Sequence, residues 1–188
     1  MNKVMVGALG AALLVGVATT PAVGEGARTG DAGFWSWLPS RRDVEPIRDE
    51  RYRTECGGCH FAYQPGLLPA AAWGRIMASL DDHFGDDATL DPEVAQGLLE
   101  YLSANAANDR RAIRSRAFAA VPVPLARPPR ITETLYFHRR HDVIPARMVK
   151  DNPKVGGFSN CQTCHRGAEQ GSYNASTVDI PGVGPWED

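Results

Sequence analysis

The sequence CGGCH at residues 56–60 recurs with the same spacing as CQTCH at residues 161–165. Two cysteines three positions apart lie on one face of a helix, where both thiols can add to the vinyl groups of one porphyrin edge. A histidine that follows at once lies beneath the same ring and can bind its iron. The two stretches therefore predict two covalently attached haem c groups. The predicted thioether residues and proximal iron ligands are Cys56, Cys59 and His60 for the first haem, and Cys161, Cys164 and His165 for the second.

Two other uses of paired cysteines fit this pattern less well. A zinc site with four cysteines needs its pairs close together, whereas Cys59 and Cys161 lie far apart and a histidine follows each pair. A thioredoxin-like dithiol belongs to a βαβ pattern, and this sequence contains no strand pattern of useful length. Haem attachment therefore remains the preferred interpretation.

The N-terminus has the pattern of an export signal. Lys3 gives a short positive start, residues 4–20 are uncharged and rich in Val, Ala, Leu and Gly, and residues 22–24 (AVG) resemble a cleavage site. Residues 1–24 are therefore predicted to be a signal peptide that directs the chain to the periplasm. Because the apolar stretch is at the short limit for crossing a bilayer, a retained membrane anchor is the alternative.

Length, composition and charge are those of an ordinary globular protein. The chain has 188 residues, of which 43% are hydrophobic, and a formal net charge of −2 at pH 7. This length suits one domain or two small ones. The arginines occur in short clusters rather than in the dense basic patch that nucleic-acid binding requires, so we expect no nucleic-acid partner.

Helical periodicity and prolines divide the rest of the chain. Residues 25–43 are predicted to be a linker or arm, and the prolines within 119–130 indicate a second linker. These linkers delimit an N-terminal haem domain, 44–118, and a C-terminal haem domain, 131–188, in an all-α fold. The predicted helices run from Val44 to Cys59, from Pro69 to about His83, from Pro92 (with Asp91 as N-cap) past Leu102, from Thr132 as N-cap to about Val143, and from Phe158 to Arg166.

The sixth ligand of each iron decides between electron transfer and catalysis, because a saturated iron has no position for a substrate. For the first haem the candidates are Met77 and His83. Met77 shares an apolar stripe with Trp73 and Leu80, which favours a role in core packing. His83 follows at the end of the same predicted helix, where a loop can bring it over the ring. We therefore predict that His60 and His83 bind the first iron.

The second haem must take its sixth ligand from upstream, because no His, Met or Lys follows His165. His138 and His141 lie one turn apart near one face of a predicted helix, so both are candidates. Met148 is a weaker candidate. The residue pattern alone does not separate His138 from His141.

These stretches resemble the bacterial dihaem cytochrome c family, often abbreviated DHC. The likeness covers about residues 44–180, and its most specific part is the run CHFAYQPGLLP at residues 59–69. It continues in HFGD at 83–86 and in RITET at 130–134. The resemblance implies that both haems are bis-histidine sites. It also implies that His141 is the sixth ligand of the second iron, with His138 as second choice.

The same resemblance implies a fold and partners. The first half would be a class I cytochrome c-like haem domain with His83 in place of the usual methionine, and the second half would be smaller and less regular. The carbonyl of Pro65 would accept a hydrogen bond from the ring of His60. The electron donor would be a membrane b-type cytochrome, and the acceptor would be a small oxygen-binding monohaem cytochrome c.

We therefore expect an electron-transfer protein and not an enzyme. It would relay single electrons through two low-spin haems and take no small-molecule substrate. The alternative is an enzyme of the dihaem peroxidase type with one open haem, but such enzymes resemble considerably longer chains. A haem-based sensor is a third option, although no signalling domain accompanies the motifs.

Overall fold

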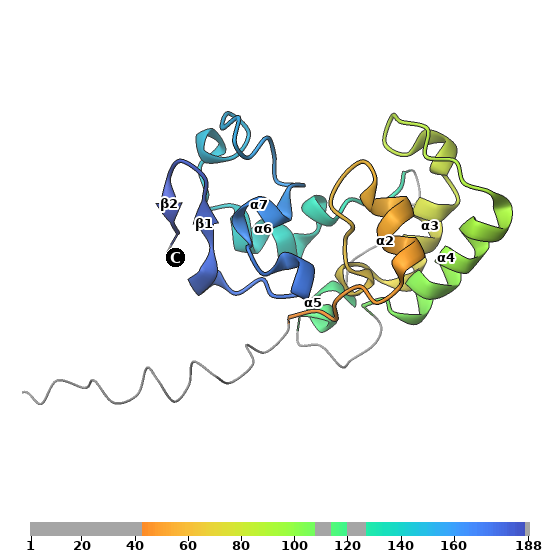
Figure 1. Cartoon of the computed structure of the whole chain (residues 1–188). Helices are drawn as coiled ribbons and strands as arrows, with labels where there is room; N and C mark the ends of the chain where they lie inside the picture. The colour runs from red at the N-terminus through yellow and green to blue at the C-terminus, as the bar shows by residue number, and fades with distance from the viewer. Residues whose placement is uncertain (1–42, 108–113, 120–126, 187–188) are drawn as a thin grey trace, which may run out of the picture. The chain divides into compact units, whose positions relative to one another are not determined.

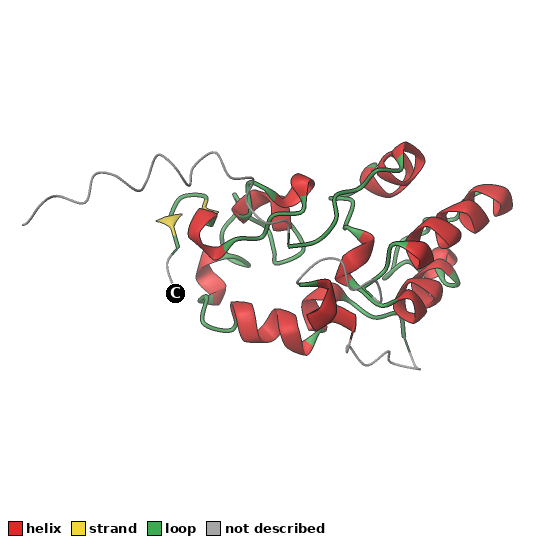
Figure 2. Cartoon of the chain, turned by 90° about the horizontal axis from the view of Figure 1, so that it is seen from below, coloured by secondary structure: helices red, strands yellow, loops and turns green. Residues whose placement is uncertain are grey.

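The computed structural model describes residues 43–107, 114–119 and 127–186, all within one compact unit, Ser40–Asp188 (Figure 1). The predicted signal peptide, 1–24, and all but the last residue of the predicted arm, 25–43, lie outside the described residues. The described part is mostly helical with few strands (Figure 2). None of its helices is long and apolar enough to cross a membrane.

Helices and short 3-10 turns alternate along the chain. The α-helices are α2 (Glu50–Gly57), α3 (Ala70–Met77), α4 (Pro92–Ala104), α5 (Ser115–Ala119), α6 (Leu135–His141) and α7 (Cys161–Cys164). The 3-10 turns are η1 (Pro65–Leu67), η2 (Leu80–Asp82), η3 (Ile131–Glu133), η4 (Ala146–Met148), η5 (Ala168–Gln170) and η6 (Ala175–Thr177). A two-stranded antiparallel hairpin, which the sequence did not predict, pairs β1 (Asp179–Ile180) with β2 (Gly184–Pro185).

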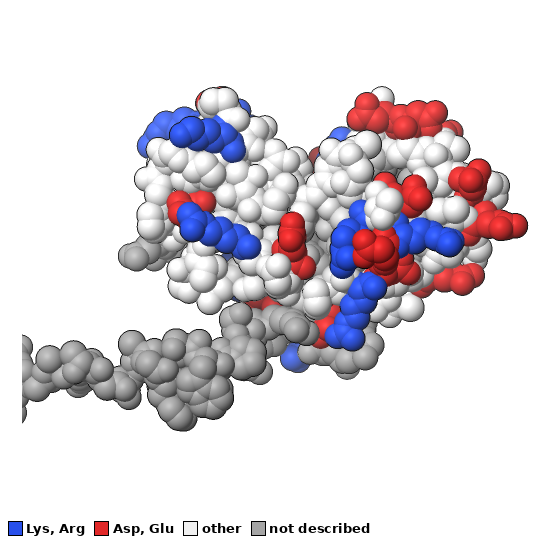
Figure 3. All heavy atoms as spheres, viewed as in Figure 1, with Lys and Arg blue, Asp and Glu red and all other residues white. Residues whose placement is uncertain are grey.

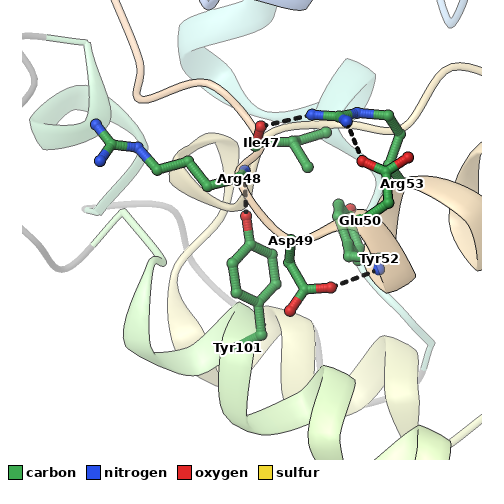
Figure 4. Close-up of polar contacts among 7 residues, drawn as sticks. All are labelled: Ile47, Arg48, Asp49, Glu50, Tyr52, Arg53 and Tyr101. Carbon is green, nitrogen blue, oxygen red and sulfur yellow. Dashed lines mark hydrogen bonds and ion pairs between the residues drawn. The ribbon is translucent and has the colours of Figure 1, made fainter.

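Helix α2 begins later than the predicted start at Val44. Asp49 is its N-cap, and the carboxylate of Asp49 accepts a hydrogen bond from the backbone N–H of Tyr52 at 2.8 Å (Figure 4). The preceding backbone is bonded elsewhere, because the N–H of Arg48 donates to the hydroxyl of Tyr101 in α4 at 3.2 Å. The prediction of a helix from Val44 was therefore wrong at its N-terminus.

Helix α3 ends at Met77, before the predicted end at His83. The hydroxyl of Ser79 donates to the carbonyl of Arg75 at 3.1 Å, and the Ser79 backbone has left the helical region. His83 then lies in a tight turn, where its N–H donates to the carbonyl of Asp86 at 2.7 Å. A loop therefore presents His83, although the helix before it is shorter than expected.

Helices α2, α3 and α4 bury the largest apolar cluster of the described residues (Figure 1). Helix α4 starts as predicted, with Asp91 as N-cap and Pro92 at the first helical position. The buried members of the cluster are Ile47, Tyr52, Ala62, Leu68, Ala72, Trp73, Ile76, Leu98, Leu102 and Ala106.

In the second half, α6 begins after Thr134 rather than after the predicted Thr132. The hydroxyl of Thr134 accepts a hydrogen bond from the N–H of Phe137 at 3.1 Å, which makes Thr134 the N-cap. Helix α7 covers only residues 161–164, so the predicted helix from Phe158 to Arg166 was too long. A small cluster of aliphatic residues forms the core of this half: Val149, Val155, Val178 and Ile180.

The segment before the first cysteine motif is hydrogen-bonded to the segment after the second. The N–H groups of Asp43 and Val44 donate to the carbonyl of Gly171 at 2.9 and 3.1 Å. Gly171 has a φ of +75°, and a Cβ placed there would lie 2.1 Å from the carbonyl oxygen of Val44. Only glycine therefore fits where these two segments meet.

Candidate haem sites

The two cysteine motifs differ from the fully helical geometry that their spacing suggested. In the first motif Cys56 lies in α2, whereas Cys59 and His60 follow its last residue, Gly57. In the second motif both cysteines lie in α7, and His165 follows with a non-helical backbone. His60 therefore lies three residues past the end of α2, whereas His165 directly follows α7 and its N–H still donates to the carbonyl of Cys161 at 2.8 Å. Each histidine ring faces a second histidine from a separate segment.

The first motif brings His60 opposite His83. The centroids of the two imidazole rings are 6.1 Å apart, and their planes differ by 16°. A metal–nitrogen bond measures about 2 Å and a ring nitrogen lies about 1 Å from its ring centre, so one iron between two imidazoles separates the ring centres by about 6 Å. The spacing of His60 and His83 fits one haem iron.

A backbone carbonyl orients the ring of His60, but it is not the predicted one. Nδ1 of His60 donates to the carbonyl of Phe61 at 2.8 Å. The carbonyl of Pro65 instead accepts a hydrogen bond from the indole N–H of Trp73 at 2.7 Å. The prediction of a His60–Pro65 bond was therefore wrong, because Phe61 lies closer in the chain and Trp73 needs a partner for its buried N–H. Nε2 of His60 remains for a metal.

The second motif brings His165 opposite His141. These ring centroids are also 6.1 Å apart, with an angle of 76° between the planes. The ring of Phe137 stacks on His141 at a centroid distance of 3.9 Å, and Nδ1 of His141 donates to the carbonyl of Phe137 at 2.9 Å. Both histidines line one cavity together with both cysteines of the motif, Cys161 and Cys164. The donor set and the spacing fit a second covalently attached haem.

Burial lowers the pKa of one histidine in each facing pair. Burial, followed by the influence of His141 and Arg114, lowers the pKa of His165 to about 4. Nδ1 of His165 is buried and has no hydrogen-bond partner among the described residues. The pKa of His83 is also lowered, first by burial and then by His60 and Arg130. In both histidines the lowered pKa favours the neutral imidazole, which is the form that binds a metal.

The alternative uses of the cysteines find no support in this geometry. Burial raises the pKa of Cys56 to about 11 and that of Cys161 to about 12. Reactive dithiol motifs require the opposite shift, because the thiolate is the nucleophile. Across the part of the chain that the structure describes, no group of three or more His, Cys, Asp or Glu residues could hold a metal ion.

The remaining candidate ligands make other contacts. His138 is exposed on α6, and its ring lies beside Phe137. Met77 packs against the core of α2, α3 and α4, as the sequence suggested. Met148 packs against the aliphatic cluster of the second half.

A buried polar network joins the two halves, and the sequence analysis did not single out its members. Gln64 is fully buried, donates from its amide nitrogen to the carbonyl of Ala168, and accepts from the hydroxyl of Tyr173 at 2.5 Å. The N–H of Tyr173 donates to the carboxylate of Asp43 at 2.6 Å, and Asp43 pairs with Arg114 at 2.7 Å. No local signal marks these residues, because their partners are far apart in the sequence.

Comparisons with known proteins agree with this geometry. Residues 52–173 match the family Dihaem cytochrome c. The chain is similar to the diheme cytochrome c sb-DHC from Shewanella baltica OS155, with 45% identity and a TM-score of 0.63 over 75% of this chain and 99% of that one. It is also similar to the diheme cytochrome c from Rhodobacter sphaeroides, with 40% identity and a TM-score of 0.58 over 69% of this chain and 100% of that one.

A search of curated proteins found no match. The family match covers most of the chain, and both solved relatives are covered almost completely. This chain therefore belongs to the dihaem cytochrome c family and carries two covalently attached haem c groups for haem-based electron transfer.

Proposed function

We propose that this chain is a periplasmic electron relay in which two histidines bind each iron. One observation carries the proposal. In each cysteine motif, the centroid of the histidine ring lies 6.1 Å from the centroid of a second imidazole ring. The proposed assignments are Cys56 and Cys59 with iron ligands His60 and His83 for the first haem, and Cys161 and Cys164 with iron ligands His165 and His141 for the second.

Saturated irons suit electron transfer rather than catalysis. Two imidazoles bound to each iron would leave no position for a substrate or dioxygen. Because imidazole donates electrons more strongly than a thioether, both haems should have lower reduction potentials than haems with histidine and methionine ligands. The dihaem peroxidase alternative needs one open or displaceable position, and a second histidine faces each proximal one.

We also propose the organisation and the partners that the family resemblance suggests. Residues 44–118 would form a class I cytochrome c-like haem unit and residues 131–188 a smaller one, after removal of the signal peptide 1–24. A membrane b-type cytochrome would supply electrons, and a small oxygen-binding monohaem cytochrome c would accept them. Mass measurement of the exported protein tests the cleavage, because the mature chain should lack residues 1–24.

Carbon monoxide is the most direct test of the ligation. It binds a reduced haem only where an axial position is open or opens readily. The spectrum of the reduced protein should therefore remain that of low-spin haem shortly after carbon monoxide is added. Rapid formation of a carbon monoxide complex on either haem of the native protein would contradict the bis-histidine assignment and favour the enzyme alternative.

A further inference from the structure

The turn that carries His83 is strained. Phe84 has a φ of +60° and is the one non-glycine residue with a positive φ among the described residues. Such a backbone is costly for an aromatic residue, so surrounding contacts must hold it in place. Gly85 follows with a φ of +109°, and its N–H donates to the carboxylate of Asp82 at 3.0 Å. These local bonds close the turn, and Phe84 also packs against the core of α2, α3 and α4, so a contact with the Phe84 ring acts on the position of the whole turn.

Arg130, which follows the proline-rich segment, contacts this turn although it lies far from the turn in the sequence. Its guanidinium carbon lies 4.0 Å above the centre of the Phe84 ring. The Phe84 ring in turn contacts the His83 ring edge to face, with centroids 4.9 Å apart. A continuous line of contacts therefore runs from Arg130 through Phe84 to His83.

The backbone beside Arg130 is anchored. The next residue, Ile131, packs against the core of α2, α3 and α4 and against a second buried cluster of Val44, Leu67, Ala107 and Phe118. Nε of Arg130 also lies 3.9 Å from the carboxylate of Glu133. The guanidinium is thus directed at Phe84 from a fixed segment, and its charge also acts on the neighbouring imidazole of His83.

We propose that Arg130 is a positioning residue for the first haem: by covering Phe84 it holds the His83 turn closed over the iron. This inference rests on the proposed ligation of the first iron by His83. The segment that leads into the second haem region therefore controls how readily the first iron exchanges its sixth ligand. An arginine is suited to this task because its planar cation stacks on an aromatic face.

The test compares Arg130→Gln with Arg130→Lys and Arg127→Gln in the full, haem-loaded protein. Arg127 is a control from the same segment, because its ion pair is with Glu133 at 2.6 Å. In Arg130→Gln, carbon monoxide should bind half of the reduced haem about two- to fivefold faster than in the native protein, the change that corresponds to an exposed cation–π contact. Arg130→Lys should restore most of the native rate, and Arg127→Gln should keep it.

A second readout is the reduction potential. Removing a cation near the iron favours the oxidised state, so the lower charge in Arg130→Gln should decrease the potential of one haem and leave the other unchanged. A third variant, Phe84→Leu, removes the ring without changing the charge. It should speed carbon monoxide binding as Arg130→Gln does, but it should leave both potentials close to native.

Two outcomes would overturn the proposal, and they are distinguishable. If Arg130→Gln binds carbon monoxide as slowly as a low-spin native protein, Arg130 does not hold the turn, and the bis-histidine assignment stands. If the native protein already binds carbon monoxide rapidly on half of its haem and His83→Ala changes nothing, then His83 is not a ligand and the proposed ligation itself fails.

Discussion

Each of the two haem regions contains a pair of facing histidines, but the second histidine of each pair is held in a different way. In the first, His83 lies on a short turn that contains a strained Phe84. In the second, His141 lies in α6, stacked on Phe137 and bonded to its carbonyl. The imidazole pairs have the same 6.1 Å separation but differ in interplanar angle, 16° against 76°. The comparison teaches that two histidine pairs with the same ring separation need not be equally supported or have the same ring orientation.

The regions also differ in charge, which the formal net charge of −2 conceals. Residues 43–107 contain twelve acidic and four basic residues, whereas residues 127–186 contain five acidic and eight basic ones. Figure 3 shows acidic side chains gathered over the turn between α3 and α4, and basic ones over the segment between α6 and α7. A charged redox partner will therefore be attracted to one region and repelled from the other.

Removal of the proposed sixth ligand from the second region should have the largest effect on this comparison. In His141→Ala we expect half of the haem to become high-spin and to bind carbon monoxide at once, because the opposing imidazole is gone. His138→Ala is the matched control on the same helix and should keep the native spectrum. A high-spin signal from His138→Ala alone would show that the two histidines have been assigned the wrong way round.

The junction of the two regions should be the next most sensitive position. Gly171→Ala places a Cβ against the carbonyl of Val44 at a positive φ, so we expect it to lower the free energy of unfolding by at least about 2 kcal/mol. Gly97→Ala is the control, because Gly97 lies exposed in α4 with open space around it. That change should raise stability by about 0.5–1 kcal/mol. Denaturant unfolding measures both, and equal stability of the two variants would contradict the close approach.

Loss of the buried amide of Gln64, which joins the two regions, should lower the free energy of unfolding by less than the change at Gly171. Gln64→Leu leaves the hydroxyl of Tyr173 without its acceptor and removes one of two hydrogen bonds to the carbonyl of Ala168, which keeps the N–H of Gly171 at 2.9 Å; we expect a loss of about 1–3 kcal/mol of unfolding free energy. Gln96→Leu is a matched control, because Gln96 is exposed and bonds only to Glu100 on the same helix. Its effect should stay within about 0.5 kcal/mol. If the two variants unfold at the same denaturant concentration, the network does not stabilise the junction.

The smallest expected effect comes from the difference between the two interplanar angles of the histidine pairs. Electron paramagnetic resonance should detect it. In the proposed ligation, the nearly parallel rings of His60 and His83 would act on the same iron d orbital and separate its energy from that of its partner orbital. The nearly perpendicular rings of His141 and His165 would act on both orbitals and leave them close in energy. The oxidised protein should therefore give two distinct low-spin signals, the second more anisotropic than the first. Two identical signals would contradict the observed ring planes.

The part of the site that could be predicted from the sequence is the part with local signals. The CxxCH spacing depends on neighbouring residues and identified both haem motifs. Helix α4 was placed correctly because Asp91 and Pro92 mark its start. The start of α6 was predicted at the wrong threonine, because the hydroxyl of Thr134, and not that of Thr132, caps the helix.

The contacts between the regions could not be predicted in this way. Gln64 pairs with residues more than a hundred positions away, and nothing in its neighbourhood distinguishes it from an ordinary turn residue. The contact of Arg130 with Phe84 likewise joins segments on either side of the proline-rich stretch. Such contacts depend on how the helices and loops pack in three dimensions. The spacing of residues along the sequence does not carry this information.

The bond between Asp43 and Tyr173 also has a consequence for biosynthesis, because it spans 130 positions of the chain. Synthesis delivers the N-terminus first. The motif at residues 56–60 therefore precedes the segment around Gly171 and Tyr173 by more than a hundred positions. While only the first motif has emerged, the bonds that join Asp43 and Val44 to that later segment cannot have formed, so the first cysteine pair lies on a chain that is still open there.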